Sequence, residues 1–211
     1  MARITGAKCR LCRREKIKLF LKGDRCYTGK CAIEKGGIIP GQHGKKMSKL
    51  SEYGVRLREK QRAKRIYGMN EGQFRRFYGI AAGKKGVTGE YLLKLLESRL
   101  DSVVYRAGLA ASRDAAKILV LHGHVQVNGK FVNIASYILA PGDIVTVKEK
   151  SKGMKAIKMS IDRVKERGGI TSGAWLDVDF DNLKVTFKKM PEESEIGSIL
   201  NKQLIVEFYN R

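Results

Sequence analysis

Four cysteines near the start of the chain place the strongest constraint on how it can fold. They lie within 23 positions, with the spacing Cys9-x2-Cys12-x13-Cys26-x4-Cys31. Two close pairs separated by a loop can converge on one tetrahedral metal ion, because each pair spans one edge of the tetrahedron. We expect Zn²⁺ here, with an iron–sulfur cluster as the alternative, because four thiolates suit both.

Other fates for these thiols are less favoured. Disulfides need an oxidising compartment, and nothing in the sequence indicates export. A catalytic cysteine needs a nearby base such as histidine, and one nucleophile does not account for four cysteines. Free thiols in a disordered arm are disfavoured by the turn residues Gly23-Asp24 and Thr28-Gly29, which allow the chain to reverse direction.

A metal would also stabilise the first 45 residues, which contain few large apolar side chains. We therefore predict a zinc-binding basic arm over residues 1–45. Its cations would then lie on a fixed surface instead of a floppy tail. The candidate nucleic-acid contacts of the arm and of the Gly- and Pro-containing connector that follows are Arg10, Arg13, Arg14, Lys16, Lys18, Lys30, Lys45 and Lys46.

The charge balance identifies the class of partner. The chain carries 43 Lys or Arg against 21 Asp or Glu, with net +17 in residues 1–98 and net +5 in residues 99–211. Such a field attracts polyanions, whereas solubility alone needs a charge of only about 2–8. A membrane surface would favour an apolar face opposite the basic one, and segment 56–65 has little of one. Nucleic acid is the favoured partner.

The sequence gives no sign of a membrane or of secretion. No stretch approaches the roughly 20 apolar residues that a membrane helix needs. The basic N-terminus is not followed by the apolar segment of a secretory signal. We therefore expect a cytoplasmic protein without membrane contact.

The middle of the chain is predicted to be helical and basic. Ser51 can cap a helix that Gly68 ends, and within it only Glu59 opposes the cations of segment 56–65. We expect this row to stay uncompensated until an anion lies along it, although a solvated face is the alternative. A second helix over residues 71–82 would turn its aromatic side chains inward. The candidate contacts on these helices are Arg56, Arg58, Lys60, Arg62, Lys64, Arg65, Arg75 and Arg76.

Residues 99–150 are predicted to form a compact helix–hairpin unit. Leucines along 90–107 make one apolar helical stripe with a break near Ser98. A helix capped by Ser112 buries Ala115, Ala116, Ile118 and Leu119, and Asn128-Gly129 predicts a hairpin whose second strand covers 131–134. The candidate contacts here are Arg99, Arg106, Ser112, Arg113, Lys117, His122, His124, Gln126, Asn128 and Lys130, the two histidines being equally explicable as surface or cap residues.

The remaining chain completes an α+β fold. A second hairpin over 175–187 carries Asp177, Asp179 and Asp181, whose alternation predicts a solvated edge strand instead of a metal site. The tail is apolar enough to dock as a helix onto the N-terminal helices. We predict a metal-bound arm (1–45), a basic helical domain (46–98, completed by 190–211), and an inserted domain (99–189) in which helices pack on a small antiparallel sheet.

Several segments resemble one family. The run "SRLDSVVYRAGLAASRDAAKILVLHGHVQVNGKFVNIASYILAPGD" resembles the helix–hairpin RNA-binding module named after small-subunit ribosomal protein four. "LSEYGVRLREKQRAKRIYG", "QFRRFY" and "LNKQLIVEFYNR" resemble the ribosomal protein family itself, and the cysteine quartet resembles its zinc-binding bacterial form. One departure is Ala135, where the family pattern has proline, a change that removes no contact group.

The resemblance implies a structural constituent of the small ribosomal subunit, in the cytoplasmic ribosome. It implies a primary binder of rRNA that nucleates assembly of the subunit body, contributes to translational accuracy and, in some bacteria, represses its own mRNA. The implied partners are small-subunit rRNA, ribosomal protein five and mRNA near the point where it enters the ribosome.

The residues themselves indicate a binding protein and not an enzyme. The sequence offers no nucleophile–base pair, no phosphate-binding glycine loop and no paired inward carboxylates, so we expect no small-molecule substrate. The alternatives are an RNA-modifying enzyme with the same module, such as a pseudouridine synthase, and a DNA-binding zinc protein. The first needs a catalytic domain for which 211 residues leave no room.

Overall fold

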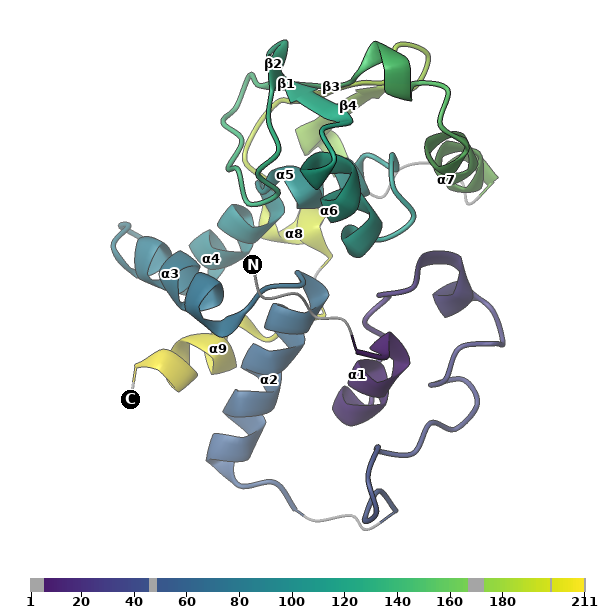
Figure 1. Ribbon diagram of the computed structural model, residues 1–211. Coiled ribbons are helices and arrows are strands. Elements are labelled where there is room, and N and C mark those ends of the chain that lie inside the picture. Colours follow the sequence, from purple (N-terminus) through teal and green to yellow (C-terminus); the bar gives the residue numbers. More distant parts are fainter. Residues whose placement is uncertain (1–5, 46–48, 167–172, 198, 211) are drawn as a thin grey trace. The chain divides into compact units, whose positions relative to one another are not determined.

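The computed structural model describes residues 6–45, 49–166, 173–197 and 199–210 (Figure 1). The chain divides into two compact units, which are treated separately below. Unit 1 comprises Met1–Leu92 and Ile199–Arg211, and unit 2 comprises Leu93–Ser198. Within the described ranges, no helix combines the length and apolar character needed to cross a bilayer.

Unit 1 is helical. The elements in chain order are α1 (Lys8–Glu15), the 3₁₀ turn η1 (Gly23–Tyr27), α2 (Glu52–Ile66), α3 (Glu71–Ala82), the start of α4 (Thr88–Glu97) and α9 (Lys202–Tyr209). Side chains cap α2, α3 and α9, and the cap of α2 by Ser51 is the one that the sequence predicts. Ser51 Oγ accepts a hydrogen bond from Gly54 N at 3.2 Å, and Asn70 Oδ1 accepts one from Gln73 N at 2.8 Å.

The C-terminal helix α9 packs against α2, so the expected docking of the tail is confirmed (Figure 1). Arg56 Nε donates to Glu207 Oε2 at 2.7 Å, across 151 positions of sequence. The rings of Tyr78 and Tyr209 stack with centroids 4.4 Å apart, and Tyr78 Oη donates to Asn210 Oδ1 at 2.8 Å. Unit 1 is therefore built from both ends of the chain.

Unit 2 combines helices with one antiparallel sheet, which confirms the α+β class. Its helices after α4 are α5 (Leu100–Arg106), α6 (Arg113–Leu121), α7 (Lys155–Glu166) and α8 (Glu193–Ile196), with 3₁₀ turns η2 (Glu149–Ser151) and η3 (Gly173–Trp175). The strands are β1 (Val125–Val127), β2 (Lys130–Phe131), β3 (Ile144–Val147), β4 (Leu176–Asp179) and β5 (Lys184–Phe187), in the order β2-β1-β3-β5-β4.

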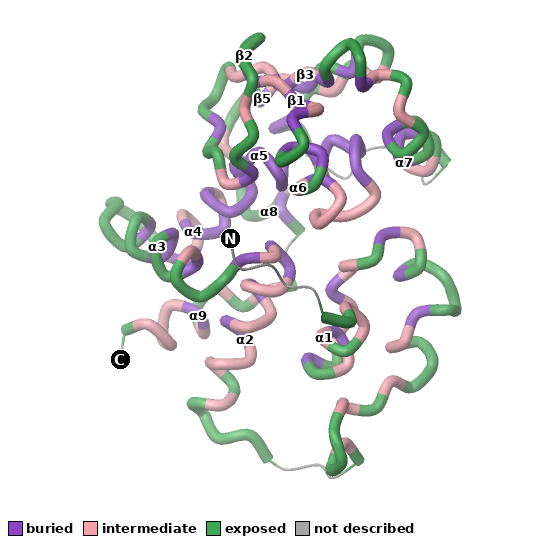
Figure 2. Tube along the Cα trace, viewed as in Figure 1, coloured by how far each residue is buried: buried purple, intermediate pink, exposed green. Residues whose placement is uncertain are grey.

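The β1–β2 hairpin turns at Asn128-Gly129, where both residues have positive φ (49° and 75°), as a type I′ turn requires. Its second strand is shorter than predicted, because β2 ends at Phe131 instead of continuing to Ile134. The chain then leaves the sheet edge, and Ala135 O accepts a hydrogen bond from Asp101 N of α5 at 3.1 Å. Figure 2 shows β2 exposed and much of α5 buried.

The core of unit 2 lies between the sheet and the faces of α5 and α6. Trp175 is fully buried and meets the Phe187 ring edge-on, with centroids 5.7 Å apart. On α6, Ala116, Leu119 and Val120 are buried, whereas Ile118 is 37% exposed, so its predicted core role is wrong. The helical period carries Ile118 away from the buried stripe.

The second hairpin has the expected acidic edge. Strand β4 lies at the end of the sheet, and its Asp177 is exposed. Asp179 Oδ1 accepts hydrogen bonds from the backbone N–H groups of Asp181 and Asn182 at 3.0 and 3.1 Å. These bonds close the turn into β5, so Asp179 has a structural role in a solvated edge.

Candidate nucleic-acid interface and cysteine pocket

The four cysteines line a single small cavity in unit 1. Cys9 and Cys12 lie on α1, Cys26 lies in η1, and Cys31 follows a turn in which its N–H donates to Thr28 O at 2.9 Å. The cavity has a volume of about 10 Å³, enough for one water-sized sphere. All four residues are free thiols, and Cys9 is the least buried of them.

The surroundings of the Cys12 and Cys26 sulfurs have opposing effects on the pKa of these thiols. Burial raises the pKa of the Cys12 and Cys26 thiols, backbone hydrogen bonds lower it, and neighbouring cysteines raise it again. One such bond runs from Lys22 N to Cys26 Sγ at 3.4 Å. In the part of the chain that the structure describes, no three Cys, His, Asp or Glu side chains have the arrangement of a metal site. The fold gathers the thiols without showing that they bind a metal.

The predicted cations of the arm differ in their surroundings. Lys18 pairs with Glu34, and Arg13 Nη1 donates to Ile38 O at 3.5 Å. Lys46 lies outside the described residues. The exposed members are Arg10, Arg14, Lys16, Lys30 and Lys45.

The basic row on α2 is compensated by carboxylates, which corrects the expectation of an uncompensated row. Each predicted cation of this helix lies within ion-pair distance of at least one Asp or Glu, and most of these carboxylates come from other elements. The pairs are Arg56 with Glu52 and Glu207, Arg58 and Arg65 with Glu15, Lys60 and Lys64 with Glu71, and Arg62 with Glu59.

Glu15 joins the cysteine arm to α2. It is the last residue of α1 and only 3% exposed, and Arg58 Nη1 donates to its Oε1 at 3.1 Å. Arg65 also pairs with this oxygen, and Arg62 Nη2 donates to the backbone oxygen of Glu15 at 3.4 Å. A buried carboxylate without cations would be strongly destabilising, so these arginines are committed to holding the arm.

Glu71 joins three helices on the opposite face of α2. Its carboxylate accepts from Lys60 Nζ at 2.8 Å, Lys64 Nζ at 3.1 Å and Tyr209 Oη at 2.9 Å. Burial raises its pKa, but these hydrogen bonds outweigh burial and bring the pKa down to about 2. The pKa of Tyr209 is raised, first by burial and then by its hydrogen bond to Glu71.

The outer face of α3 and the loop after it carry cations that are exposed to solvent. Arg75 and Arg76 are exposed, as predicted, while Phe74, Phe77 and Tyr78 face the core. Lys84 and Lys85 are also exposed, and the predicted contact set omits them. The signal that could have identified them is the lysine pair between Gly83 and Gly86, because glycine-flanked loops project from the surface.

In unit 2, two predicted arginines converge on a fully buried carboxylate. Arg106 makes a bidentate pair with Glu97 at 2.8 and 3.0 Å, and Arg113 Nη2 reaches the same carboxylate at 2.9 Å. The Arg113 guanidinium also lies 4.6 Å from the centre of the Tyr105 ring. Glu97 thus fixes the direction of both arginines.

Arg99 does not have the predicted surface position. It is 1% exposed, and its Nε donates to Asp101 Oδ1 at 2.9 Å in a bidentate pair. Its backbone also bridges to Ile138. The structure therefore encloses the guanidinium of Arg99 with its own carboxylate, and the RNA contact stays a prediction.

The remaining predicted residues of the helix–hairpin module lie along α6 and the first hairpin. Ser112 Oγ caps α6 by accepting from Ala115 N at 3.2 Å. His124 Nδ1 lies 2.9 Å from Ser151 Oγ, and Asn128 Nδ2 donates to Asp143 Oδ1 at 2.8 Å. His122 and Lys130 are exposed, and Lys117 and Gln126 are half-buried.

The chain is similar to known proteins along its whole length. Residues 3–97 match the family model of the ribosomal protein S4/S9 N-terminal domain, and residues 98–145 match the S4 domain. Similar proteins include "small ribosomal subunit protein uS4" of Magnetococcus marinus (53% identical over 211 residues), of Pelotomaculum thermopropionicum (52% over 211) and of Natranaerobius thermophilus (54% over 216). Each comparison spans 100% of both chains.

The depressed pKa of Glu71 predicts a pH-dependent contribution to stability. Because the pKa is about 2 in the folded chain and 4.5 ordinarily, the contribution is fully present above pH 4.5 and is lost as the pH falls toward 2. We expect Glu71→Gln to lower the free energy of unfolding by about 1–2 kcal/mol at pH 7, a value discounted because the side chain is 46% exposed. Urea unfolding at pH 7 and pH 3 measures the difference.

The matched control is Glu52→Gln, which removes the same charge from a side chain that is 81% exposed in the first turn of α2. We expect this variant to change stability by less than about 0.5 kcal/mol. A Glu71→Gln effect of equal size at pH 7 and pH 3 would contradict the assignment.

Proposed function

The chain belongs to the family of small ribosomal subunit protein uS4, and from this premise we propose that it is a structural constituent of the small ribosomal subunit that binds its rRNA. The observation that carries the proposal is the match of residues 3–145 to two adjoining models of this family, together with relatives that align along their full length. The charge of +22 supports a polyanionic partner.

The proposed mechanism divides the cations into two groups. Cations paired with carboxylates of the protein hold the scaffold, and cations for which the described residues provide no carboxylate partner neutralise RNA phosphates. Within the described part of unit 1, the cations for which no carboxylate lies at ion-pair distance include Arg10, Arg14, Lys30, Lys45, Arg75, Arg76, Lys84 and Lys85. Contacts of this kind recognise the shape of a folded RNA more than its sequence.

We extend the proposal to the cysteine pocket. The four sulfurs line one cavity of the size of a single atom or water molecule, and sulfur ligands in this number suit Zn²⁺. Cys9, Cys12, Cys26 and Cys31 would hold the ion as thiolates, and the ion would close the arm over residues 1–45. An iron–sulfur cluster is the alternative occupant.

The finer expectations remain proposals. They are a role in nucleating assembly of the subunit body, in translational accuracy and in repression of its own mRNA. They also include contact with ribosomal protein five and with mRNA, and the assignment of the RNA-binding module to residues of about 99–150. The absence of a catalytic constellation in the sequence supports a role without enzymatic activity.

Binding to rRNA is tested by the salt dependence of affinity. We expect the full-length protein to prefer small-subunit rRNA over an unrelated structured RNA of equal length. The slope of log Kobs against log[salt] should steepen by about 0.7–0.9 for each phosphate neutralised. A slope near zero, or equal affinity for both RNAs, would refute rRNA binding by this mechanism, and duplex DNA as competitor distinguishes a DNA-binding protein.

Metal binding is tested by elemental analysis of the purified protein. We expect one zinc ion per chain, lost in Cys12→Ser and Cys26→Ser and retained in Tyr27→Phe, a control next to Cys26 that leaves every thiol in place. Loss of the ion should make segment 1–45 sensitive to protease while Trp175 in unit 2 keeps its fluorescence. Visible absorption with bound iron would favour the cluster, and a metal-free, protease-resistant arm would overturn the proposal.

A further inference from the structure

Lysines for which the described residues provide no carboxylate partner form a second basic surface in unit 2, outside the region that the family models match. The matched region ends at residue 145, whereas η2 and α7 span Glu149–Ser151 and Lys155–Glu166. Segment 148–165 holds seven Lys or Arg and two Asp or Glu. The predicted RNA contacts end at Lys130, so this surface has no assigned role.

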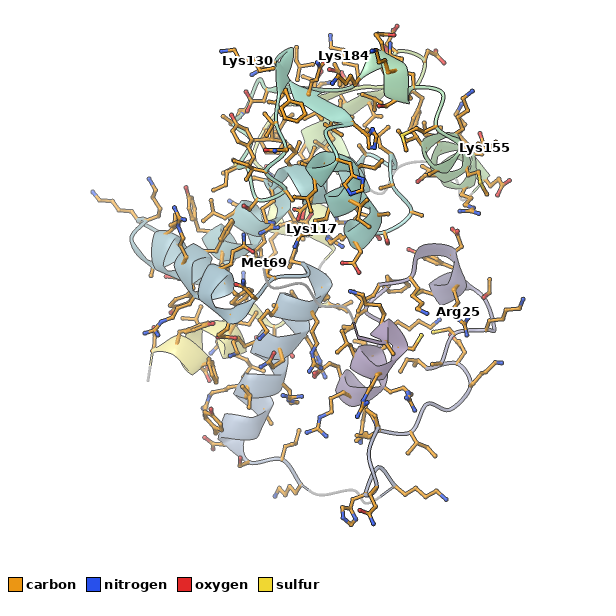
Figure 3. All side chains as sticks on the ribbon, viewed as in Figure 1. Arg25, Met69, Lys117, Lys130, Lys155 and Lys184 are labelled. Carbon is orange, nitrogen blue, oxygen red and sulfur yellow. The ribbon has the colours of Figure 1, made fainter. Side chains whose placement is uncertain are left out.

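The surface is mounted on a fixed helix. Ile157 and Ile161 of α7 are buried in the core of unit 2. Ser160 Oγ donates to Gly108 O, at the end of α5, at 2.8 Å. This packing fixes the orientation of α7 within unit 2, and with it the direction of the side chains on the solvent-exposed face. Figure 3 shows Lys155 pointing away from the helix.

Three lysines on this surface differ from those of α2 in having no ion pair. Lys150, Lys155 and Lys158 are exposed, and no carboxylate among the described residues lies within ion-pair distance of them. Lys155 and Lys158 are three positions apart, so their Cα atoms are separated by about 4.5 Å along the helix axis. Neighbouring like charges at this spacing repel, and an anion along the face would relieve the repulsion.

The chemistry of the face favours RNA over a protein partner. Protein interfaces are depleted in lysine and depend on apolar or aromatic anchors, and the large apolar side chain exposed on α7 is Met159 alone among the described residues. Lysine acts as a point charge without the planar fork of arginine, so it suits contact with a phosphate.

We propose that Lys150, Lys155 and Lys158 form a second contact of unit 2 with the RNA backbone, separate from the helix–hairpin module. The proposal rests on the proposed function, because it names further residues for rRNA binding. In Figure 1, α7 lies apart from the hairpin strand β2 within this unit. Two separated contacts on one rigid unit would select an RNA whose phosphates match both positions.

The test compares two double variants of the full-length protein on small-subunit rRNA. Lys155→Gln/Lys158→Gln removes the proposed contact. Lys184→Gln/Lys188→Gln removes the same charge from the same unit where acidic neighbours already neutralise it. Lys188 Nζ lies 3.1 Å from Asp177 Oδ2, and Lys184 is paired in register with Asp179. Figure 3 shows Lys184 on the sheet, apart from Lys155.

We expect the α7 variant to lower the magnitude of the salt slope by about 1.4–1.8, from 0.7–0.9 per phosphate, with a several-fold rise in Kd. The control variant should keep the wild-type slope. Urea unfolding followed by Trp175 fluorescence should be the same for all three proteins, because the substituted side chains are exposed.

An unchanged slope in the α7 variant would overturn this inference and leave the face to another partner. Equal losses in both variants would also overturn it, because the effect would then be one of net charge alone. These results differ from failure of the proposed function, in which the wild-type protein itself shows no preference for rRNA or a slope near zero.

Discussion

The pairing of α2 cations with carboxylates from distant segments is the interaction on which the rest of unit 1 depends. Three carboxylates form ion pairs with the basic helix α2: Glu15 from the cysteine arm, Glu71 from α3 and Glu207 from the C-terminal helix. A buried carboxylate such as Glu15 is tolerated only with cations around it, so removing either side leaves an uncompensated charge. These ion pairs make one scaffold of segments that lie far apart in the sequence.

This pairing changes which cations of the chain are available to contact RNA. A net of +17 over residues 1–98 first suggests that the densest basic stretch, residues 56–65, contacts RNA. In the folded chain the cations of that stretch form ion pairs within the scaffold, and among the described residues of unit 1 the arm, the outer face of α3 and the loop after it carry cations with no carboxylate at ion-pair distance. In unit 2, Glu97 directs Arg106 and Arg113 in the same way, while Lys155 and Lys158 of α7 have no carboxylate at ion-pair distance among the described residues. This arrangement supports the proposal that cations held on folded elements recognise the shape of an RNA.

Features set by local chemistry were predictable from the sequence. The caps at Ser51 and Ser112 and the turn at Asn128-Gly129 depend on neighbouring residues, and all three are present as predicted. The clustering of the cysteines followed from their spacing, whereas ligation of a metal depends on atomic geometry that spacing does not fix. The fate of several cations was not predictable, because their partners lie elsewhere in the chain: Arg58 meets Glu15 across 43 positions. The burial of Arg99 was not predictable although its partner Asp101 is two residues away, because burial of the pair is a tertiary property.

The division between scaffold cations and RNA-binding cations is tested most directly by lysine acetylation, read residue by residue with mass spectrometry, in the free protein and in its complex with small-subunit rRNA. Lys64 and Lys188 represent lysines with a carboxylate partner, and Lys30 and Lys158 represent lysines without one in the described structure. The account predicts that RNA protects Lys30 and Lys158 and leaves the reactivity of Lys64 and Lys188 unchanged. Protection of Lys64 with no change at Lys30 and Lys158 would contradict it.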